Sequence, residues 1–526
     1  MLASLARRKE LMRPALTDLQ EQNFDVAIVG GGINGASAAH HLATAGYKIL
    51  LVDKADFGSG ASSRSSRLLH CGLMYLAPYD SIGRILLHPG HLLHGMEMAR
   101  FSMRGRDDFV KYFSNRLTPF QFYYPLSSDQ PFSPPQVKLG FAILKNLYRG
   151  GQPLDYEYLD AKSAKNNPFL KRISDPDSLR GAIRLQEYKY DWPERIVMDY
   201  VLSAEALGAI VRNYTAVESI ERESNHWKVG LRETTENHSD TATICATVIL
   251  NLTGVWTDKV VRLSGQQTAR RVGTTKGVHI AIKLDPEFRA MGFVAMQRDG
   301  KGPFFCVPWR EMHYIGPTRT AFNADIEDVR PTEEDVAVLL DDTERLLPGL
   351  RLKRSQVLFA WAGVRPQTYD ETHPLKAAHA RKFHDFGSEA LPNVFSLTSS
   401  PIMYQKQTGE EILALIQKRL PLRHAPASAG PMPQRTEREK DILVDPKRNV
   451  FALREIATRQ HCITLSDILC RRLGACWNER MGLDIASEVA EIVAPTLGWT
   501  GERTRGEVDD YRAFIGRSFL GPFSER

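Results

Sequence analysis

The sequence predicts an α/β protein with a parallel nucleotide-binding sheet, a second sheet domain and a small helical domain near the C-terminal end. Three observations support this class. Residues 24–53 show a strand–helix–strand pattern, strand-like segments such as FFCVPW (304–309) recur later, and a Pro/Ala-rich segment at 421–437 precedes a helical pattern. A chain of 526 residues, 43% of them hydrophobic, can form roughly two to four domains.

The first unit carries a glycine-rich turn between two apolar strands. FDVAIVG (24–30) is a β-branched run typical of a strand covered on both faces, and KILLVD resembles it after an alanine-rich helix. Gly30, Gly32 and Gly35 occupy G-x-G-x-x-G positions, which allow a tight turn, a close approach to a pyrophosphate and close helix packing. Asp53 ends the second strand, where a carboxylate can accept ribose hydroxyls. The unit predicts dinucleotide binding.

A serine-rich segment follows Asp53 directly. ADFGSGASSRSSRLLH (55–70) is dense in hydroxyl groups and small residues, which can donate hydrogen bonds along an extended ligand. A generic Ser/Gly surface loop is the alternative. The position directly after the ribose-binding acid favours a cofactor that extends past its pyrophosphate into the protein, as FAD does.

The charge balance and the cysteines exclude several classes of protein. Sixty-eight basic residues nearly match 62 acidic ones, so the formal charge of +6 does not indicate a nucleic-acid surface but suits anionic substrates or membranes. The six cysteines form no CxxC pair, which argues against a zinc site and a disulfide framework. We therefore expect no metal, no nucleic-acid partner and a reducing compartment, with the cytoplasm as the default.

Residues 1–23 form an N-terminal tail with basic residues near its start. The tail lacks the apolar core of a secretory signal, and its acidic residues weaken the alternative of an organellar transit peptide. No stretch approaches the roughly 18 consecutive apolar residues of a membrane span. We expect a soluble or peripheral protein.

Two later segments contain residues suited to cofactor and anion binding. TVILNLTGVWTD is an apolar strand that ends in a turn at Thr253 and Gly254, where the backbone could approach a cofactor and Trp256 could close over it. An ordinary strand and turn is the alternative. In WAGVRPQ, Pro366 restricts Arg365 to extended geometry, so its guanidinium is held in place for an anion or a reacting oxygen. A salt bridge under a loop is the alternative.

TTKGVHIAI places Lys276 and His279 before an apolar run, where either could face an anionic substrate. A lone histidine in a strand is as readily a structural group. The sequence leaves both readings open.

Together these segments resemble the FAD-dependent, quinone-linked glycerol-3-phosphate dehydrogenases of glycerol catabolism. The resemblance rests on VAIVGGGINGASAA, LVDKADFGSGASSRSSRLLH, GLMYL, NLTGVWTD, TKGVHIAI, VPWREMHYIGPTRT, WAGVRPQ and TLSDILCRRLGACW, and it covers most of the chain. It implies an FAD-binding Rossmann-like domain of the glutathione-reductase/D-amino-acid-oxidase type. It also implies an antiparallel-sheet substrate domain and a small C-terminal helical domain.

The resemblance implies roles for individual residues. The expected catalytic residues are Arg365, His70, His279 and Tyr75. Either histidine could remove the hydroxyl proton as hydride leaves for flavin N5. The expected substrate-binding residues are Arg365, Tyr75, Lys276 and, by a looser alignment, Arg381. Cofactor contacts are expected from Gly30, Gly32, Asn34, Gly35, Asp53, Lys54, Ser62, Ser63, Ser65, Ser66, Arg67, Val217, Thr253, Gly254 and Trp256.

The implied reaction is oxidation of the secondary hydroxyl of a polyol phosphate, foremost sn-glycerol 3-phosphate, with quinone as electron acceptor. The chain departs from the family at the substrate end. Met74 replaces an arginine, Arg319 replaces an acid, and SLTSSPIMYQKQTG lacks a Gly-Gly-Lys segment, with Lys406 out of register. A tetritol phosphate, another polyol, a hydroxy acid, an oxidase reaction and a non-catalytic FAD-binding relative therefore stay open.

We expect a discontinuous FAD domain at 24–105, 190–280 and 360–420, a substrate domain at 106–189 and 281–359, a linker at 421–437 and a helical domain at 438–526. Thr464 and Asp467 resemble a helix start. The aromatic and proline-rich segment 119–150, with nearby cations, could lie at a membrane interface, or be a packed loop and core helix. A homodimer is compatible with the sequence.

Overall fold

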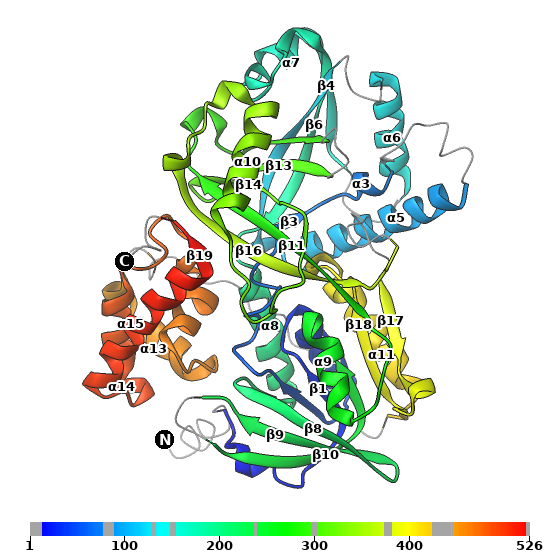
Figure 1. The fold of residues 1–526 in the computed structure, drawn as a ribbon, viewed down its shortest axis with the longest axis vertical. Helices are drawn as coiled ribbons and strands as arrows, with labels where there is room; N and C mark the ends of the chain where they lie inside the picture. The colour runs from blue at the N-terminus through cyan, green and yellow to red at the C-terminus, as the bar shows by residue number, and fades with distance from the viewer. Residues whose placement is uncertain are drawn as a thin grey trace.

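The computed structural model describes residues 13–76, 89–127, 133–147, 154–235, 239–296, 302–372, 381–422, 443 and 445–521. Two β-sheets and a group of C-terminal helices make up this part of the chain, and Figure 1 shows these helices at one side of the two sheets. The linker expected at 421–437 lies outside the described residues apart from its first two positions, as do residues 1–12 of the N-terminal tail.

The first sheet is the predicted nucleotide-binding sheet. Its strand order is β17-β18-β10-β1-β2-β7, and all of its neighbouring pairs are parallel except β17–β18. A β8–β9 hairpin extends it from β10 in antiparallel fashion. The strands are β1 (Asn23–Val29), β2 (Ile49–Val52), β7 (Ile210–Arg212), β8 (Thr215–Glu223), β9 (His226–Glu233), β10 (Thr241–Asn251), β17 (Lys382–Asp385) and β18 (Val394–Thr398).

Three helices share one buried core with this sheet: α2 (Ile33–Thr44), α8 (Pro193–Ala206) and α11 (Gln405–Gln417). Because α2 connects the parallel strands β1 and β2, the predicted strand–helix–strand unit is confirmed. The third glycine of the turn has a steric role, since a Cβ on Gly35 would lie 1.9 Å from the Gly30 carbonyl oxygen. Glycine there lets the helix begin directly against the strand end.

The second sheet has the order β19-β16-β11-β14-β13-β12-β4-β6-β3, with β15 paired to β11 and β5 paired to β6. Its pairs are antiparallel except β12–β4, which confirms the expected class of sheet. The strands are β3 (Leu68–Leu69), β4 (Leu117–Ser127), β5 (Tyr156–Asp160), β6 (Leu179–Tyr190), β11 (Val272–Ile282), β12 (Met291–Met296), β13 (Pro303–Trp309), β14 (Met312–Gly316), β15 (Thr320–Ala321), β16 (Val357–Thr368) and β19 (Phe519–Leu520).

The boundaries expected at 280 and 360 fall inside β11 and β16. These two strands pair with each other along nearly their whole length. A domain boundary within them would divide a continuous ladder of backbone hydrogen bonds, so the structure places both strands entirely in the second sheet. The helices near this sheet are α3 (Leu73–Leu76), α5 (Pro89–Tyr112), α6 (Pro134–Leu147), α7 (Ala161–Asn166) and α10 (Glu333–Leu346), whereas α9 (Thr257–Val261) packs beside β10 of the first sheet.

The C-terminal region is helical, as expected. It contains α13 (Val450–Arg459), a π-helical turn (Asp467–Arg472), α14 (Ala486–Leu497) and α15 (Gly501–Ser518). The predicted helix start is confirmed, because Asp467 N–H donates to Thr464 Oγ1 at 3.2 Å and Thr464 N–H donates back to Asp467 Oδ2 at 3.0 Å. After α15 the chain returns to the second sheet as β19. The apolar core of the C-terminal helices is continuous with the core of that sheet.

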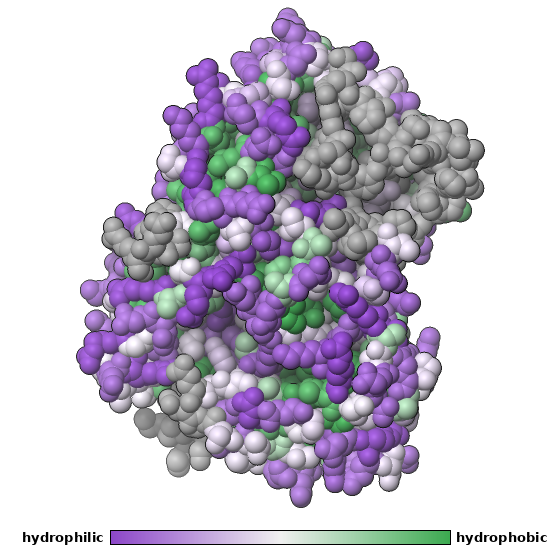
Figure 2. All heavy atoms as spheres, viewed as in Figure 1, coloured by the Kyte–Doolittle hydropathy of each residue, from purple (hydrophilic) through white to green (hydrophobic). Residues whose placement is uncertain are grey.

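No helix in the described ranges is both long and apolar enough to cross a membrane. On the face that Figure 2 shows, hydrophilic side chains dominate and apolar ones form separate groups.

Candidate active site

A cavity of about 940 Å³ lies where the two sheets meet the C-terminal helices. It is lined by the β1–α2 turn, the segment 53–70, β11, β16, the segment before α11 and part of the C-terminal helical region. Its volume falls in the range of cofactor and small-molecule sites. Most of the residues expected to contact a cofactor lie on its wall.

The glycine turn and Asp53 form one end of the cavity. Gly30 has a φ of +105°, and a Cβ there would lie 2.7 Å from the Leu252 carbonyl oxygen. The Asp53 carboxylate accepts from the N–H groups of Gly31 (2.7 Å) and Ala55 (2.9 Å), while burial raises the pKa of Asp53 to about 6. The open turn at the start of α2 and the fixed acid match the requirements of a pyrophosphate and a ribose.

The serine-rich segment 59–66 folds over the start of α2. Ser62 Oγ accepts from the Ile33 N–H at 3.0 Å, and Ser63 Oγ donates to the Gly60 carbonyl at 2.9 Å. These bonds fix the path of the segment along the cavity. It lies tightly on β16, because a Cβ on Gly363 would approach the Arg64 carbonyl oxygen to 2.7 Å.

Arg67 anchors this segment from beneath. Its guanidinium lies 4.0 Å from the ring centroid of Trp477 and 4.6 Å from that of Trp309, and it donates to the Ser63 carbonyl at 2.9 Å. The Arg67 N–H donates to Ser65 Oγ at 3.2 Å. The side chain is completely buried, so Arg67 holds the cavity wall in place while forming part of it.

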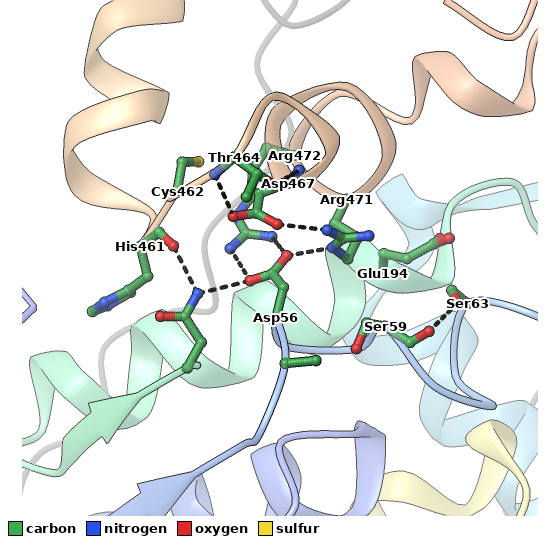
Figure 3. Close-up of polar contacts among 12 residues, drawn as sticks. Asp56, Ser59, Ser63, Glu194, His461, Cys462, Thr464, Asp467, Arg471 and Arg472 are labelled. Atoms are coloured by element: carbon green, nitrogen blue, oxygen red, sulfur yellow. Dashed lines mark hydrogen bonds and ion pairs between the residues drawn. The ribbon is translucent and has the colours of Figure 1, made fainter. Parts of the chain in front are cut away.

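A buried ion cluster joins the segment to the C-terminal helical region (Figure 3). Asp56 accepts two hydrogen bonds of 2.7 Å from Arg472 and a further one from Arg471. Asn213 donates to the same carboxylate at 2.9 Å, and Arg471 also contacts Asp467 at 2.5 Å. The two arginines hold the pKa of Asp56 below its usual range, against the opposing effect of burial. The cluster fixes the loop that begins at Asp53.

His70 and Tyr75 lie at the other end of the cavity. Burial lowers the pKa of His70 to about 4, and its buried Nδ1 has no hydrogen-bond partner among the described residues. The two ring centroids are 6.0 Å apart, and the Tyr75 hydroxyl lies 3.4 Å from that of Tyr404. The imidazole is neutral at physiological pH and therefore competent as a base.

His279 lines the same cavity from β11. Its ring stacks on Trp361 with centroids 4.8 Å apart, and Nε2 lies 3.0 Å from Ser66 Oγ. Its Nδ1 is buried and has no hydrogen-bond partner in the part of the chain that the structure describes. Burial, followed by the charges of Arg365 and Arg67, lowers the pKa of His279 well below its ordinary value. Both candidate bases are therefore neutral, and the geometry does not choose between them.

Arg365 projects from β16 into the cavity beside His279. Burial and then the charge of Arg319 lower the pKa of Arg365 to about 10, so its guanidinium remains protonated at neutral pH. It makes no hydrogen bond or ion pair with the described residues. An arginine in this state is suited to bind an oxyanion.

Two expected substrate-binding cations lie off the cavity wall. Lys276 forms an ion pair with Asp335 at 2.7 Å. Arg381 forms an ion pair with Glu411, and hydrogen bonds to Ser400 (3.1 Å) and a threonine also hold it. Both cations are thus neutralised by carboxylates of the chain itself. Lys406 likewise pairs with a neighbouring glutamate, and the Met74 side chain lies outside the described part.

The other expected cofactor residues mostly line the cavity. Asn34 donates to the Ser400 carbonyl at 3.2 Å, and Lys54 and Trp256 both bond to Glu327, at 2.6 and 2.7 Å. Trp256 is therefore held beside the cavity entrance by a residue from the second domain. Val217, Thr253, Gly254 and Gly32 are lining residues, whereas Gly35 lies beneath the wall.

The structure adds wall residues that the sequence interpretation did not include as site residues. They are Arg64, Arg319, Tyr404, Arg471, Cys476 and Trp477. Arg319 is the one with a visible signal, because a cation stands there in a strand-flanking GPTR motif where the family resemblance implies an acid. The contribution of the C-terminal helices has no local signal, since the partners are more than 400 residues apart.

The fold and the cavity define a dinucleotide-binding protein with a histidine- and arginine-lined reaction end. Residues 25–398 match the sequence profile of the FAD dependent oxidoreductases, and the chain belongs to this family. FAD is therefore its cofactor, and the glycine turn, Asp53 and the folded serine-rich segment fit that group.

Several characterised proteins are similar to the chain. Glycerol-3-phosphate dehydrogenase 2 of Mycobacterium tuberculosis is 29% identical over 94% of this chain and 89% of its own length. Glycerol-3-phosphate dehydrogenase of Synechocystis sp. is 27% identical over 80% and 74%. The structure of the Bacillus halodurans glycerol-3-phosphate dehydrogenase complexed with FAD superposes with a TM-score of 0.70 at 19% identity, covering 97% of both chains.

Replacing Asp56 by Asn should loosen the cofactor site, because the neutral amide leaves Arg471 and Arg472 buried with only partial compensation. We expect the free energy of unfolding to fall by about 3–5 kcal/mol and FAD to dissociate faster. Thermal unfolding and the rate of flavin fluorescence recovery on dilution measure the two effects. Asp177→Asn, which removes an exposed ion pair with Lys165, is the control and should cost less than about 1 kcal/mol. Equal effects of the two variants would contradict the role of the cluster.

Proposed function

We propose that this protein oxidises the secondary hydroxyl of a polyol phosphate, foremost sn-glycerol 3-phosphate to dihydroxyacetone phosphate, and passes the electrons to quinone. The observation that carries the proposal is the lining of the cavity, where Arg365 has no ion pair with the described residues and lies beside the neutral His279. The neutral His70 lines the same cavity. The names of the relatives at 26–29% identity support the same substrate.

Bound FAD supplies a two-electron acceptor for the hydride that leaves the substrate carbon. The protein contributes the groups around that carbon. Arg365 binds an oxyanion or polarises the reacting oxygen, and Tyr75 orients the substrate. His70 or His279 takes the proton from the hydroxyl, since a buried neutral imidazole is ready to accept it. The aromatic wall formed by Trp361 and Tyr404 limits the access of water.

Two other functions stay in view. The fold is also similar to that of an L-alpha-glycerophosphate oxidase from Mycoplasma pneumoniae, with a TM-score of 0.57 at 16% identity over 78% of this chain. Oxygen could therefore replace quinone as the acceptor. A non-catalytic FAD-binding role is favoured only by the loss of cations at the substrate end, where Lys276 and Arg381 pair internally.

Anaerobic bleaching of the bound flavin tests the proposed function. The purified holoenzyme is mixed with glycerol 3-phosphate, a tetritol phosphate, glycerol, erythritol and glycerate. We expect bleaching by the polyol phosphates and not by the free polyols, because Arg365 provides charge to bind the phosphate. Arg365→Met should lower kcat/KM by about 10²-fold or more, while Arg289→Met, an exposed site paired with Glu311, should leave it unchanged. No bleaching by any compound would support the non-catalytic role, and peroxide formation in air would identify an oxidase.

The pH dependence distinguishes a buried neutral histidine from an ordinary one. Because the folded-state pKa of His70 is lowered to about 4, protonation that would inactivate a His70 base occurs well below the ordinary value of 6.5. The rate of flavin reduction at saturating substrate should therefore stay constant from about pH 7.5 down to about pH 5.5, except for changes caused by ionisation of the substrate phosphate itself. A fall with a midpoint near 6.5 would contradict this. His70→Asn and His279→Asn then identify the base, whose loss should cost about 10²–10⁴-fold.

We also propose a cytoplasmic location with peripheral contact to the membrane, where quinone resides. On α6, which lies in the predicted interfacial segment, Leu139 and Ile143 are exposed by 62% and 39%. Leu139→Glu should weaken co-sedimentation with anionic vesicles, because a carboxylate opposes insertion beside anionic lipids. Phe451→Glu, at an exposed site on α13, is the control. A wild-type protein that stays entirely in the supernatant would remove this proposal.

A further inference from the structure

Two arginines border the strand that carries His279. On β11, Thr275 pairs with Arg365 of β16 on one side, while Lys276 pairs with Thr320 of β15 on the other. The residue that precedes Thr320 is Arg319. The antiparallel pairing therefore brings Arg319 and Arg365 to opposite sides of the same short stretch of β11, and both line the cavity.

A glycine on β11 leaves room for the Arg365 guanidinium. Gly277 and Gly363 pair directly on β11 and β16, and both lie on the cavity wall. A Cβ on Gly277 would lie 3.5 Å from Arg365 Nη2, so the Arg365 guanidinium extends over the glycine backbone. Directly paired residues point to the same face of a sheet, as do residues two positions apart on one strand. His279 and Arg365 therefore lie on the same face as Gly277 and Gly363.

Neither guanidinium is neutralised by the described part of the chain. Arg365 and Arg319 form no ion pair and no hydrogen bond there, and Arg319 Nε is buried without a partner. The neighbouring cations differ, since Lys276 and Arg381 each have a carboxylate. Glu327 is engaged by Lys54 and Trp256. Two adjacent, partly buried positive charges that no carboxylate of the described residues compensates are unfavourable, and a bound oxyanion would compensate them.

We infer that Arg319 and Arg365 form a two-arginine subsite, over Gly277 and beside His279, that binds an anionic oxygen group of the substrate. The inference rests on the proposed function, because it assumes that the protein catalyses the proposed oxidation. It does not assume which substrate is oxidised. A carboxylate and a phosphate share the required chemistry, because each accepts paired N–H donors from guanidinium groups. Arg319 is thus a specificity-determining residue of this chain.

Equilibrium binding to the holoenzyme tests the subsite without requiring turnover. Inorganic phosphate and oxalate are titrated while the absorbance of the bound flavin and, independently, the heat of binding are recorded. We expect Arg319→Met to raise Kd about 10–100-fold for the anion that occupies the subsite, Arg319→Asp to raise it further, and Arg319→Lys to have an intermediate effect. Arg289→Met, at an exposed site far from the cavity wall, should leave Kd unchanged.

Each variant must retain FAD and the wild-type unfolding midpoint. If Arg319→Met loses either of these, Arg319→Lys is used in its place. Unchanged Kd values for both anions in either folded variant would overturn the subsite. Bleaching separates this result from the fate of the proposed function. If glycerol 3-phosphate bleaches the flavin and Arg319→Met raises its KM whereas Arg289→Met does not, the occupant is phosphate. If only glycerate shows that dependence, the subsite stands with a carboxylate as occupant, and the proposed polyol phosphate is wrong.

Discussion

The rest of the site depends on the hydrogen bonds that the buried carboxylate of Asp56 accepts. Asp56 lies three residues after Asp53 and receives hydrogen bonds from Arg471 and Arg472 of the C-terminal helical region (Figure 3). Since removing one partner of such a cluster leaves buried charge unpaired, the helices and the loop are held together strongly. The segment that follows Asp56 then runs along the cavity in a fixed path.

This constraint explains why the C-terminal helices belong to the cofactor site. Trp477 stacks on Arg67 of the serine-rich segment, and its indole N–H donates to Glu194 of α8 at 2.7 Å. The same region also sends β19 back to pair with β16, the strand that carries Arg365. The C-terminal helical region thus contacts both the serine-rich segment and the strand that carries Arg365. The first sheet contributes the glycine turn, and the second sheet contributes His279 and Arg365.

The reaction end combines low polarity with positive charge. Burial keeps His70 and His279 neutral, and the charge of Arg365 reinforces this effect at His279. A proton acceptor and an anion-binding cation can therefore be close neighbours without an ion pair between them. Lys276 and Arg381 are neutralised by carboxylates, whereas Arg365 and Arg319 have no such partner among the described residues.

The sequence by itself determined the cofactor end, because the information there is local. The spacing of Gly30, Gly32 and Gly35 and the acid that ends the next strand are separated by few residues, and their steric roles follow directly. Tertiary structure decided the rest. Only folding brings Arg471 to Asp56 across 415 residues, pairs Lys276 with Asp335 and places Arg319 across β11 from Arg365. The charge that a cation presents depends on such distant partners, so no local pattern could show which arginines remain free for a ligand.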